Sequence, residues 1–401
     1  MYRTRQYFVF FAFMSILLFL FARLFCLQVI DYSKFSDMAS EQHNKILKIE
    51  PRRGTIFDRF MEPLAINLDA PSVYCDPRAV KDKERTSGIL AEILRMDRSV
   101  LLDRVSRDKA FVWIKRKVDP ETAEKIKKHD LSGIHFLTES KRKYSNDNMA
   151  AHVIGFVGID NDGLEGLEFL LDDKLKGKPG WRHLVRDARM RTVLFNEEDS
   201  MPAQNGYNLV LTIDSVIQFI VEEELQWMVD KFNAKRGSVI VMDPYSGRIL
   251  ALANYPDYDL NKYFDAPRDF MKDSAVASVY EPGSVFKIVT ASAALNEEAV
   301  EMDTSIFCEN GEFRTRGRIL HDYHPYGRLI FTDVIVKSSN IGTVKVAQEL
   351  GKKTVYDYVE RFGFGRKTGI DLPGEVGGIS RHPSKWSRSD ITTIPIGQGI
   401  A

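Results

Sequence analysis

The sequence predicts a multidomain α+β protein with a single N-terminal transmembrane helix. Residues 7–30 carry one charged side chain, Arg23. Residues 31–205 mix short strand-like runs, helices and glycine-rich turns. From residue 206 onward, strand, helix and hairpin patterns follow one another closely and predict an antiparallel sheet flanked by helices. A chain of 401 residues is long enough for two or three domains, and we place the boundaries at residues 30 and 205.

The composition favours a globular protein and gives no indication of a nucleic-acid partner. The 56 Lys and Arg residues balance the 56 Asp and Glu residues, with 44% hydrophobic and 28% charged residues. Cys26, Cys75 and Cys308 make neither a disulfide framework nor a metal site. Cys26 belongs to the apolar N-terminal segment, and Cys75 and Cys308 could pair in an oxidising compartment, but we expect free thiols. No cofactor or metal site is expected.

The apolar segment at the N-terminus is long enough to span a bilayer, which needs about 20 apolar residues in a helix. Arg3 and Arg5 precede it, and this charge bias predicts a cytoplasmic N-terminus with the rest of the chain on the other side. A cleaved signal peptide is the alternative, but its apolar core would cover only about 7–15 residues and end at small residues. Here bulky Leu24 and Phe25 precede Cys26, which favours a retained anchor.

The region between the anchor and residue 205 carries no obvious nucleophile, metal cluster or phosphate loop. Residues 78–133 are charged and helical in character, and one helix is expected to begin at Pro120 with Asp119 as its N-cap. Residues 150–180 are glycine-rich, then helical, then turn-forming. These patterns indicate an extended α+β region and not a catalytic core.

The last part of the chain shows the densest secondary-structure signals. Residues 207–214 predict a strand, residues 215–232 a helix with a capping box from Ser215 to Gln218, and residues 237–255 a β-hairpin. One apolar stripe is expected along the helix, formed by Ile217, Ile220, Val221, Leu225 and Met228.

A serine and a lysine share one helix face within YEPGSVFKIVTASAAL, residues 280–295. Side chains at i and i+3 are neighbours, about 5–6 Å apart at Cβ, so the Ser284 hydroxyl can meet the Lys287 amine. A serine needs such a base to act as a nucleophile, and burial would lower the pKa of the lysine. The helix N-terminus could also stabilise an oxyanion. The alternative is that Ser284 is an ordinary N-cap and Lys287 a surface residue. The spacing alone does not exclude this, because Ser-x-x-Lys also occurs at Ser106 and Ser140 in highly charged surroundings.

A second polar motif, Ser338-Ser339-Asn340, lies between an apolar run and a helix. The Asn340 amide offers both a donor and an acceptor to a substrate, and Ser338 could relay a proton to a leaving group. The alternative is an ordinary helix cap formed by Ser339 or Asn340.

Together these motifs resemble those of the penicillin-binding proteins, whose signature set is Ser-x-x-Lys, Ser-x-Asn and Lys-Thr-Gly. Residues 52–65, which contain RRGTIFDR, are similar to the N-terminal block of class B members. Residues 142–168, RKYSNDNMAAHVIGFVGIDNDGLEGLE, are similar to a second block. FGFGRKTGIDLPGE, residues 362–375, and the closing IGQGIA are also similar to family sequence, so the resemblance covers nearly the whole chain.

Two positions depart from the family pattern: Ser145 stands where proline is usual, and Met61 where glycine is usual. Residues 72–82 and 111–121 look more like division-type members than elongation-type members.

The resemblance implies three parts in a bacterial cytoplasmic membrane protein. Residues 1–30 would form a cytoplasmic tip and membrane anchor, residues 31–205 a pedestal domain, and residues 206–401 a D,D-transpeptidase domain on the extracytoplasmic side. Implied partners are peptidoglycan stem peptides, β-lactam inhibitors, a membrane-embedded glycan polymerase and division proteins.

The resemblance also implies the chemistry of the site. In such enzymes a serine attacks D-Ala-D-Ala, releases the terminal D-Ala and passes the acyl group to an amine of a neighbouring stem. By this likeness Ser284 is the nucleophile, Lys287 its base, and Ser338 and Asn340 the second motif.

The third family motif, Lys-Thr-Gly, does not lie where the family pattern places it. Lys367-Thr368-Gly369 lies in turn-rich sequence, whereas the family's catalytic copy lies on a strand downstream of the Gly-Gln-Gly segment. We therefore expect a C-terminally truncated chain that by itself lacks full transpeptidase activity. Two alternatives remain: a non-catalytic scaffold of the division machinery, and a β-lactam-sensing or β-lactam-hydrolysing relative. No motif for a deacylating base is visible, and the long pedestal favours a synthase.

Overall fold

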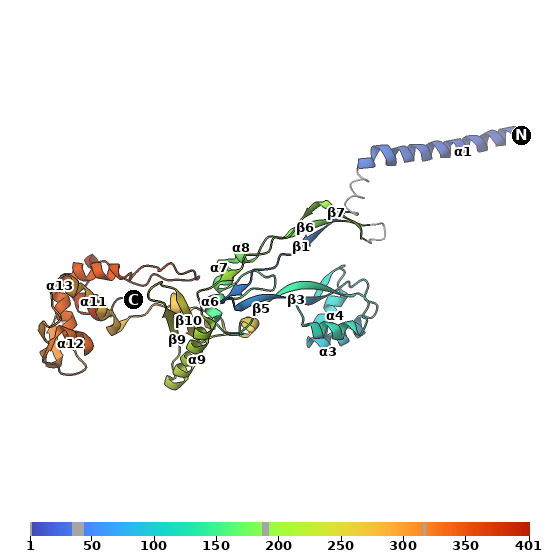
Figure 1. The fold of residues 1–401 in the computed structure, drawn as a ribbon. Coiled ribbons are helices and arrows are strands. Elements are labelled where there is room, and N and C mark those ends of the chain that lie inside the picture. Colours follow the sequence, from blue (N-terminus) through green and yellow to red (C-terminus); the bar gives the residue numbers. More distant parts are fainter. Residues whose placement is uncertain (1, 34–43, 187–191, 316–317) are drawn as a thin grey trace. The chain divides into compact units, whose positions relative to one another are not determined.

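A computed structural model describes residues 2–33, 44–186, 192–315 and 318–401. The chain forms two compact units, each built from separate stretches of sequence (Figure 1). The first unit comprises Met1–Ile56, Ala65–Arg142 and Asp173–Leu209, and the second comprises Phe57–Leu64, Lys143–Asp172 and Val210–Ala401.

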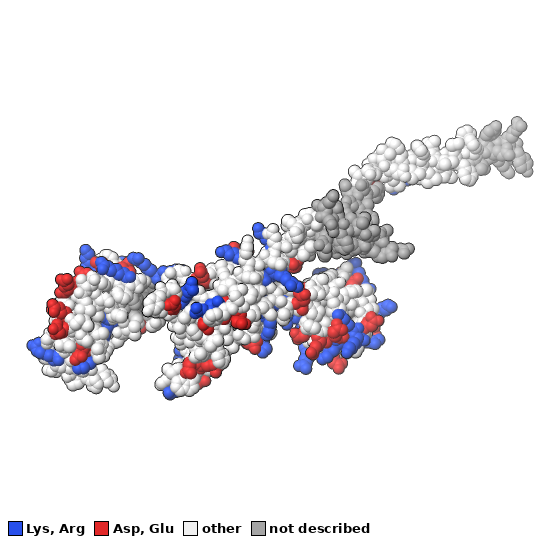
Figure 2. All heavy atoms as spheres, in the orientation of Figure 1, with Lys and Arg blue, Asp and Glu red and all other residues white. Residues whose placement is uncertain are grey.

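The predicted N-terminal segment is a helix. Helix α1 covers Tyr2–Phe25 and continues as one π-helical turn over Cys26–Ile30. The window Phe13–Ile30 has a mean hydropathy of 2.3, and in the described part of the chain this is the one helix long and apolar enough to cross a membrane. None of that window is buried, and Figure 2 shows almost no charged side chain on the described part of α1. This composition suits contact with lipid.

The first unit contains a three-stranded antiparallel sheet and a helical cluster. The sheet has the order β1-β6-β7, with β1 at Asn44–Ile49, β6 at Gly180–Arg186 and β7 at Thr192–Met201. The cluster holds α3 (Lys83–Leu94), α4 (Arg98–Ser106), β4 (Val112–Lys115) and α5 (Pro120–Lys127). Its core includes the fully buried Leu90, Leu101 and Ile114, together with Ile126 at 1% exposure.

The helical character expected for residues 78–133 is confirmed, with strand β4 inserted among the helices. Asp119 takes the N-cap position of α5 as predicted, but its side chain makes no capping hydrogen bond there. Its carboxylate lies 3.4 Å from Lys141 Nζ.

Several elements lie where the chain passes from one unit to the other. They are β2 (Ile56–Phe57), β3 (Pro63–Cys75), β5 (Ile134–Tyr144) and β8 (Leu209–Val210). Strand β3 pairs antiparallel with β4 through Val73, Tyr74 and Cys75. Three short helices follow in sequence, α6 at Ala151–Ile154, α7 at Gly166–Leu170 and α8 at Asp172–Leu175.

The second unit contains the predicted helix and hairpin. Helix α9 spans Ser215–Phe232, and strands β9 (Gly237–Met242) and β10 (Ile249–Tyr255) pair antiparallel. Leu225 and Val229 on α9 pack against Ala253 of β10. The helix and hairpin therefore follow the sequence prediction.

The predicted capping box of α9 is wrong. The N-cap is Asp214, whose Oδ1 accepts hydrogen bonds from Val216 N at 3.1 Å and Ile217 N at 3.2 Å. Gln218 instead faces inward, where its side chain exchanges two hydrogen bonds with the backbone of Leu252, at 2.8 and 2.9 Å. A buried backbone amide and carbonyl need polar partners, and Gln218 provides both.

The predicted apolar stripe of α9 is correct only in part. Leu225 is buried, whereas Ile220 is 54% exposed and Met228 is 45% exposed. The face that packs inward also uses Gln218 and Val229. Apolar residues occur on several faces of this helix, so periodicity alone did not identify the packed one.

The remainder of the second unit is mostly short elements around two longer helices, α11 (Lys287–Asn296) and α13 (Asn340–Arg361), which pack together. Two short α-helices belong to it, α10 (Ser274–Ala277) and α12 (Phe331–Val336). Short 3₁₀ turns lie at Leu260–Asp265, Arg268–Phe270, Gly283–Phe286, Glu309–Gly311, Pro383–Lys385, Asp390–Thr392 and Ile394–Ile396. Two antiparallel pairs complete it: β11 (Ser305–Phe307) with β14 (Arg328–Ile330), and β12 (Glu312–Thr315) with β13 (Arg318–His321).

Asp58, in the sequence RRGTIFDR, fixes the start of α9. The fully buried carboxylate accepts hydrogen bonds from Phe60 N at 2.8 Å, Glu62 N at 2.9 Å and Ser215 Oγ at 2.8 Å. Burial alone would raise the pKa of Asp58, but the bonds from Ser215, Glu62 and Phe60 outweigh it and lower the pKa below its usual value. This aspartate therefore joins the segment Phe57–Leu64 to the start of α9 within the second unit.

Replacing Asp58 should destabilise the second unit. We expect Asp58→Ala to cost about 2–4 kcal/mol, because a fully buried carboxylate is removed and its three hydrogen-bond donors lose their acceptor. Since the folded-state pKa is depressed, the contribution is present at neutral pH and is lost as pH falls through that pKa. Thermal unfolding of the detergent-solubilised protein at pH 7 measures the loss. Asp69→Ala, which removes an exposed ion pair with Arg52, is the control and should change stability by less than about 1 kcal/mol. Equal losses from both variants would contradict the assignment.

Candidate active site

Ser284 lies on the 3₁₀ turn Gly283–Phe286, directly before α11. The serine is exposed, whereas Phe286 is 1% exposed and packs edge-on against Phe364 with ring centroids 4.9 Å apart. The apolar residue fixes the turn while the hydroxyl remains accessible. A hydroxyl presented at a helix start on a rigid turn can meet a substrate from solvent.

Lys287 is buried three residues later, at 2% exposure. Its Nζ donates hydrogen bonds to Ser338 O at 2.6 Å and to Ser338 Oγ at 2.9 Å. Burial lowers the pKa of Lys287 to about 8, and the charge of Asp322 acts in the opposite direction. At pH values near 8 a large fraction of this amine is therefore neutral and able to accept a proton.

The structure joins Lys287 to the second motif and not directly to Ser284. Among the hydrogen bonds of the described residues, none links the Ser284 hydroxyl with the Lys287 amine, although both lie on adjacent turns as the sequence predicted. Ser338 Oγ is thus the hydroxyl that the amine contacts. A proton can pass between the lysine and Ser338 along this bond.

Residues 338–340 both cap helix α13 and contact Lys287. Ser339 is the N-cap of α13, where its Oγ accepts from Gly342 N at 2.9 Å. Ser338 precedes the cap and is exposed, with a left-handed backbone at φ +53°. Asn340 Nδ2 donates to His321 O at 3.0 Å. The capping role considered for this motif thus falls on Ser339, which leaves the Ser338 hydroxyl to Lys287.

Sequence reasoning missed Asp322, which follows strand β13. Its Oδ2 accepts from Ser339 Oγ at 2.6 Å, and its Oδ1 accepts from Asn340 N at 2.6 Å and Ile341 N at 3.0 Å. Asp322 lies 18 residues before Asn340, and no local pattern in the sequence indicates this contact.

The IGQGIA segment supports the turn that carries Ser284. Gly283 N donates to Gly397 O at 3.0 Å, and Gly399 N donates to Glu281 Oε1 at 2.7 Å. A Cβ on Gly397 would lie 2.0 Å from Gly283 O, and its φ is +76°. Only glycine allows this approach of two backbones.

Lys367-Thr368-Gly369 lies outside any strand, as the sequence predicted. The Glu375 carboxylate accepts hydrogen bonds from Thr368 N at 2.5 Å, Thr368 Oγ1 at 2.6 Å and Gly369 N at 3.2 Å. Thr368 and Gly369 are therefore held by Glu375, a residue six to seven positions later in the same loop.

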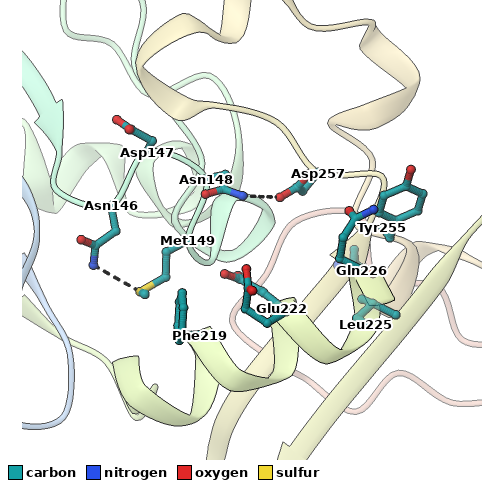
Figure 3. Close-up of a pocket in the computed structure, with 12 residues that line it drawn as sticks. Asn146, Asp147, Asn148, Met149, Phe219, Glu222, Leu225, Gln226, Tyr255 and Asp257 are labelled. Atoms are coloured by element: carbon teal, nitrogen blue, oxygen red, sulfur yellow. Dashed lines mark hydrogen bonds between the residues drawn. The ribbon is translucent and has the colours of Figure 1, made fainter. Parts of the chain in front are cut away.

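A separate cavity of about 440 Å³ lies between α9, the end of β10 and residues 146–149 (Figure 3). None of the four predicted site residues lines it. Glu222 on α9 accepts hydrogen bonds there from Ala150 N at 2.8 Å and from Gln218 Nε2 at 2.6 Å. Burial raises the pKa of Glu222 to about 6, with a further contribution from the charge of Asp257. Among the described residues, no group of three His, Cys, Asp or Glu could hold a metal ion, and the three cysteines are free.

Two family models match the chain. Residues 237–401 match the penicillin-binding protein transpeptidase domain, and residues 48–211 match the penicillin-binding protein dimerisation domain.

Curated relatives extend over almost the whole chain. Stage V sporulation protein D of Bacillus subtilis is 34% identical over 100% of this chain and 63% of its own length. Peptidoglycan D,D-transpeptidase FtsI of Escherichia coli is 32% identical over 96% of this chain and 66% of its own length. The probable peptidoglycan D,D-transpeptidase PbpC of Pseudomonas aeruginosa is 32% identical over 94% and 67%. The chain therefore spans about two thirds or less of the length of these relatives.

Solved structures have the same architecture. A peptidoglycan synthetase from Bifidobacterium adolescentis matches with a TM-score of 0.67 and 25% identity, over 89% of this chain and 70% of that one. Penicillin binding protein 3 from Mycobacterium tuberculosis, in complex with aztreonam, matches with a TM-score of 0.64 and 27% identity, over 88% and 62%.

Gly397→Ala should disturb the Ser284 turn more than backbone strain alone explains. Gly363 is the matched control, because its φ is +82° and a Cβ there would meet nothing within 4 Å. We expect about 1–2 kcal/mol of destabilisation for Gly363→Ala and about 1–3 kcal/mol more for Gly397→Ala, which adds a steric clash. Thermal unfolding gives the two losses, and hydrogen exchange at the Gly283 amide localises the effect. Similar losses with unchanged exchange at Gly283 would refute the support role of Gly397.

Proposed function

The chain belongs to the class B penicillin-binding proteins, and on this premise we propose that it is a serine-type peptidoglycan D,D-transpeptidase that cross-links stem peptides in cell-wall synthesis. One observation carries the proposal: a buried Lys287 amine bonded to the Ser338 hydroxyl, one helical turn from the exposed Ser284. A serine nucleophile needs a general base, and desolvation favours the neutral form of the Lys287 amine that can act as one.

In the proposed reaction, Ser284 first forms an ester with the donor stem and then transfers the acyl group to the acceptor stem. Its Oγ attacks the carbonyl carbon between the two D-Ala residues of a donor stem, and the hydroxyl proton passes to the neutral Lys287 amine. The proton then moves through Ser338 Oγ to the nitrogen of the departing D-Ala, which leaves an ester on Ser284. The amine of an acceptor stem attacks this ester, forms the cross-link and returns the proton to Ser284.

A β-lactam would follow only the first half of this sequence. Ser284 Oγ would open the lactam ring, and the leaving nitrogen would stay attached to the acyl group. The aztreonam complex of the related penicillin binding protein 3 supports inhibition of this kind. The Asn340 side-chain amide, already oriented by His321 O, would bind the amide of the donor stem or the inhibitor.

The remaining parts of the proposal concern location and role. We infer that residues 1–30 anchor the protein with its N-terminus in the cytoplasm, because Arg3 and Arg5 precede the apolar helix. Residues 31–205 would then act as a pedestal and residues 206–401 would lie outside the membrane. Similarity to FtsI and to a sporulation protein favours a septal role, together with a membrane-embedded glycan polymerase and division proteins.

Removing the Ser284 hydroxyl should abolish covalent labelling by penicillin. In the native protein, isolated in its own membranes, we expect one penicilloyl adduct by intact mass and none in Ser284→Ala. The control is Ser106→Ala, which removes the serine of another Ser-x-x-Lys sequence on the exposed end of α4 and should leave labelling unchanged. Labelling that persists in Ser284→Ala would refute the proposal.

The rate of acylation should depend on the protonation of Lys287. Because the neutral amine is the base, the second-order rate constant for a fluorescent penicillin should rise as pH increases and level off above about 8. Lys287→Arg keeps the positive charge but cannot deprotonate, so it should lose at least about 100-fold in rate. A flat profile between pH 6 and 9, or an active Lys287→Arg variant, would exclude Lys287 as the base.

A further inference from the structure

The first turn of α13 is held by a carboxylate from outside the helix. Asp322, at the end of the β12–β13 hairpin, accepts from the backbone N–H groups of Asn340 and Ile341 and from the Ser339 hydroxyl. The first N–H groups of a helix have no partner within it, and a negative charge is favourable there. Both oxygens of Asp322 are therefore used at the second motif.

These bonds also hold a strained backbone. Ser338 has φ +53°, a conformation that is strained for a non-glycine residue and persists only where neighbouring contacts fix it. The next residue, Ser339, is fully buried and donates its hydroxyl to Asp322 at 2.6 Å. Both oxygens that Lys287 contacts belong to Ser338, so their positions depend on that tie.

The charge of Asp322 reaches Lys287 as well. Burial lowers the pKa of Lys287, and the Asp322 carboxylate limits this decrease because it favours the ammonium form. Burial also raises the pKa of the Cys308 thiol, which lies 3.4 Å from Ser339 Oγ, so this group stays neutral near pH 8. Further titratable residues described near this part of the site include Lys345, bonded to Glu309, and His321, whose carbonyl accepts from Asn340.

We propose that Asp322 is a positioning residue for the reaction at Ser284: its hydrogen bonds to the first turn of α13 keep Ser338 and Asn340 in place, and its negative charge acts on the Lys287 amine that Ser338 contacts. The inference rests on the proposed function, because acylation of Ser284 is the reaction that it serves. None of the described hydrogen bonds of Asp322 involves Ser284, so it would act through Ser339, Asn340 and the Lys287 amine.

Two substitutions separate the two effects. Asp322→Asn keeps one carbonyl oxygen for the N–H groups of Asn340 and Ile341 but removes the charge. We expect the acid limb of the acylation profile to move to lower pH. Asp322→Ala removes the acceptors as well, and we expect a loss of roughly tenfold or more in acylation rate across the pH range, because small displacements of reacting groups cost this much. Asp333→Asn, which removes an exposed carboxylate paired with Lys337 on the nearby α12, is the matched control and should match wild type.

The acylation assay uses the native protein in its own membranes, a fluorescent penicillin, and rates normalised to the folded fraction. An unmoved acid limb in Asp322→Asn would overturn the charge effect, and a normalised rate in Asp322→Ala equal to wild type would overturn the positioning effect. Either result overturns the proposal as stated.

A second measurement does not depend on acylation. The NMR signal of ¹³Cε-labelled Lys287, assigned by its absence in Lys287→Arg, should titrate at lower pH in Asp322→Asn than in wild type. If wild-type Ser284 is not acylated but this titration shifts, the proposed function fails and the coupling of Asp322 to Lys287 stands. An unchanged titration overturns the inference whether or not Ser284 is acylated.

Discussion

The candidate site depends on one buried amine. Lys287 is the first residue of α11 and is 2% exposed, and Ser338 supplies both oxygens for its two described hydrogen bonds. A charge removed from water is costly unless it is neutralised or paired. Here burial favours the neutral amine and Asp322 limits the effect, so the group is poised between its two forms. Proton transfer near neutral pH requires this balance.

Backbone contacts between distant segments fix the turn that carries the nucleophile, three residues before Lys287. The Ser284 turn is fixed by the buried Phe286 and by Gly397, whose lack of a side chain permits the contact with Gly283. The first turn of α13 is fixed in a similar way by Asp322. Rigid turns of this kind hold reactive groups in place without loss of access to solvent.

The parts of the protein that carry no predicted chemistry also contribute to this arrangement. Asp58 is far from Ser284 in the sequence, but it lies in the same unit, where its carboxylate holds the start of α9. Residues 146–150 contact the same helix through Glu222. The sequence blocks that resemble the family outside the catalytic motifs therefore have a structural reason: their polar groups satisfy buried donors and acceptors around α9.

Local sequence determined the elements and the reactive groups of this protein. The α1 helix, the α9 helix, the hairpin and the pairing of Ser284 with Lys287 on adjacent turns follow from hydrophobic period, turn residues and i, i+3 spacing, which act over a few residues. The Asp214 cap of α9 is also a local contact, with the backbone N–H groups of Val216 and Ile217, and the predicted cap at Ser215 lies one residue too late. Only the tertiary structure decided that Gln218 contacts Leu252 and that Lys287 contacts Ser338, 51 residues away. The contact of Asp322 with α13 belongs to the same class. A buried donor or acceptor takes whichever partner the fold brings within hydrogen-bonding distance, and residue spacing along the chain does not encode that distance.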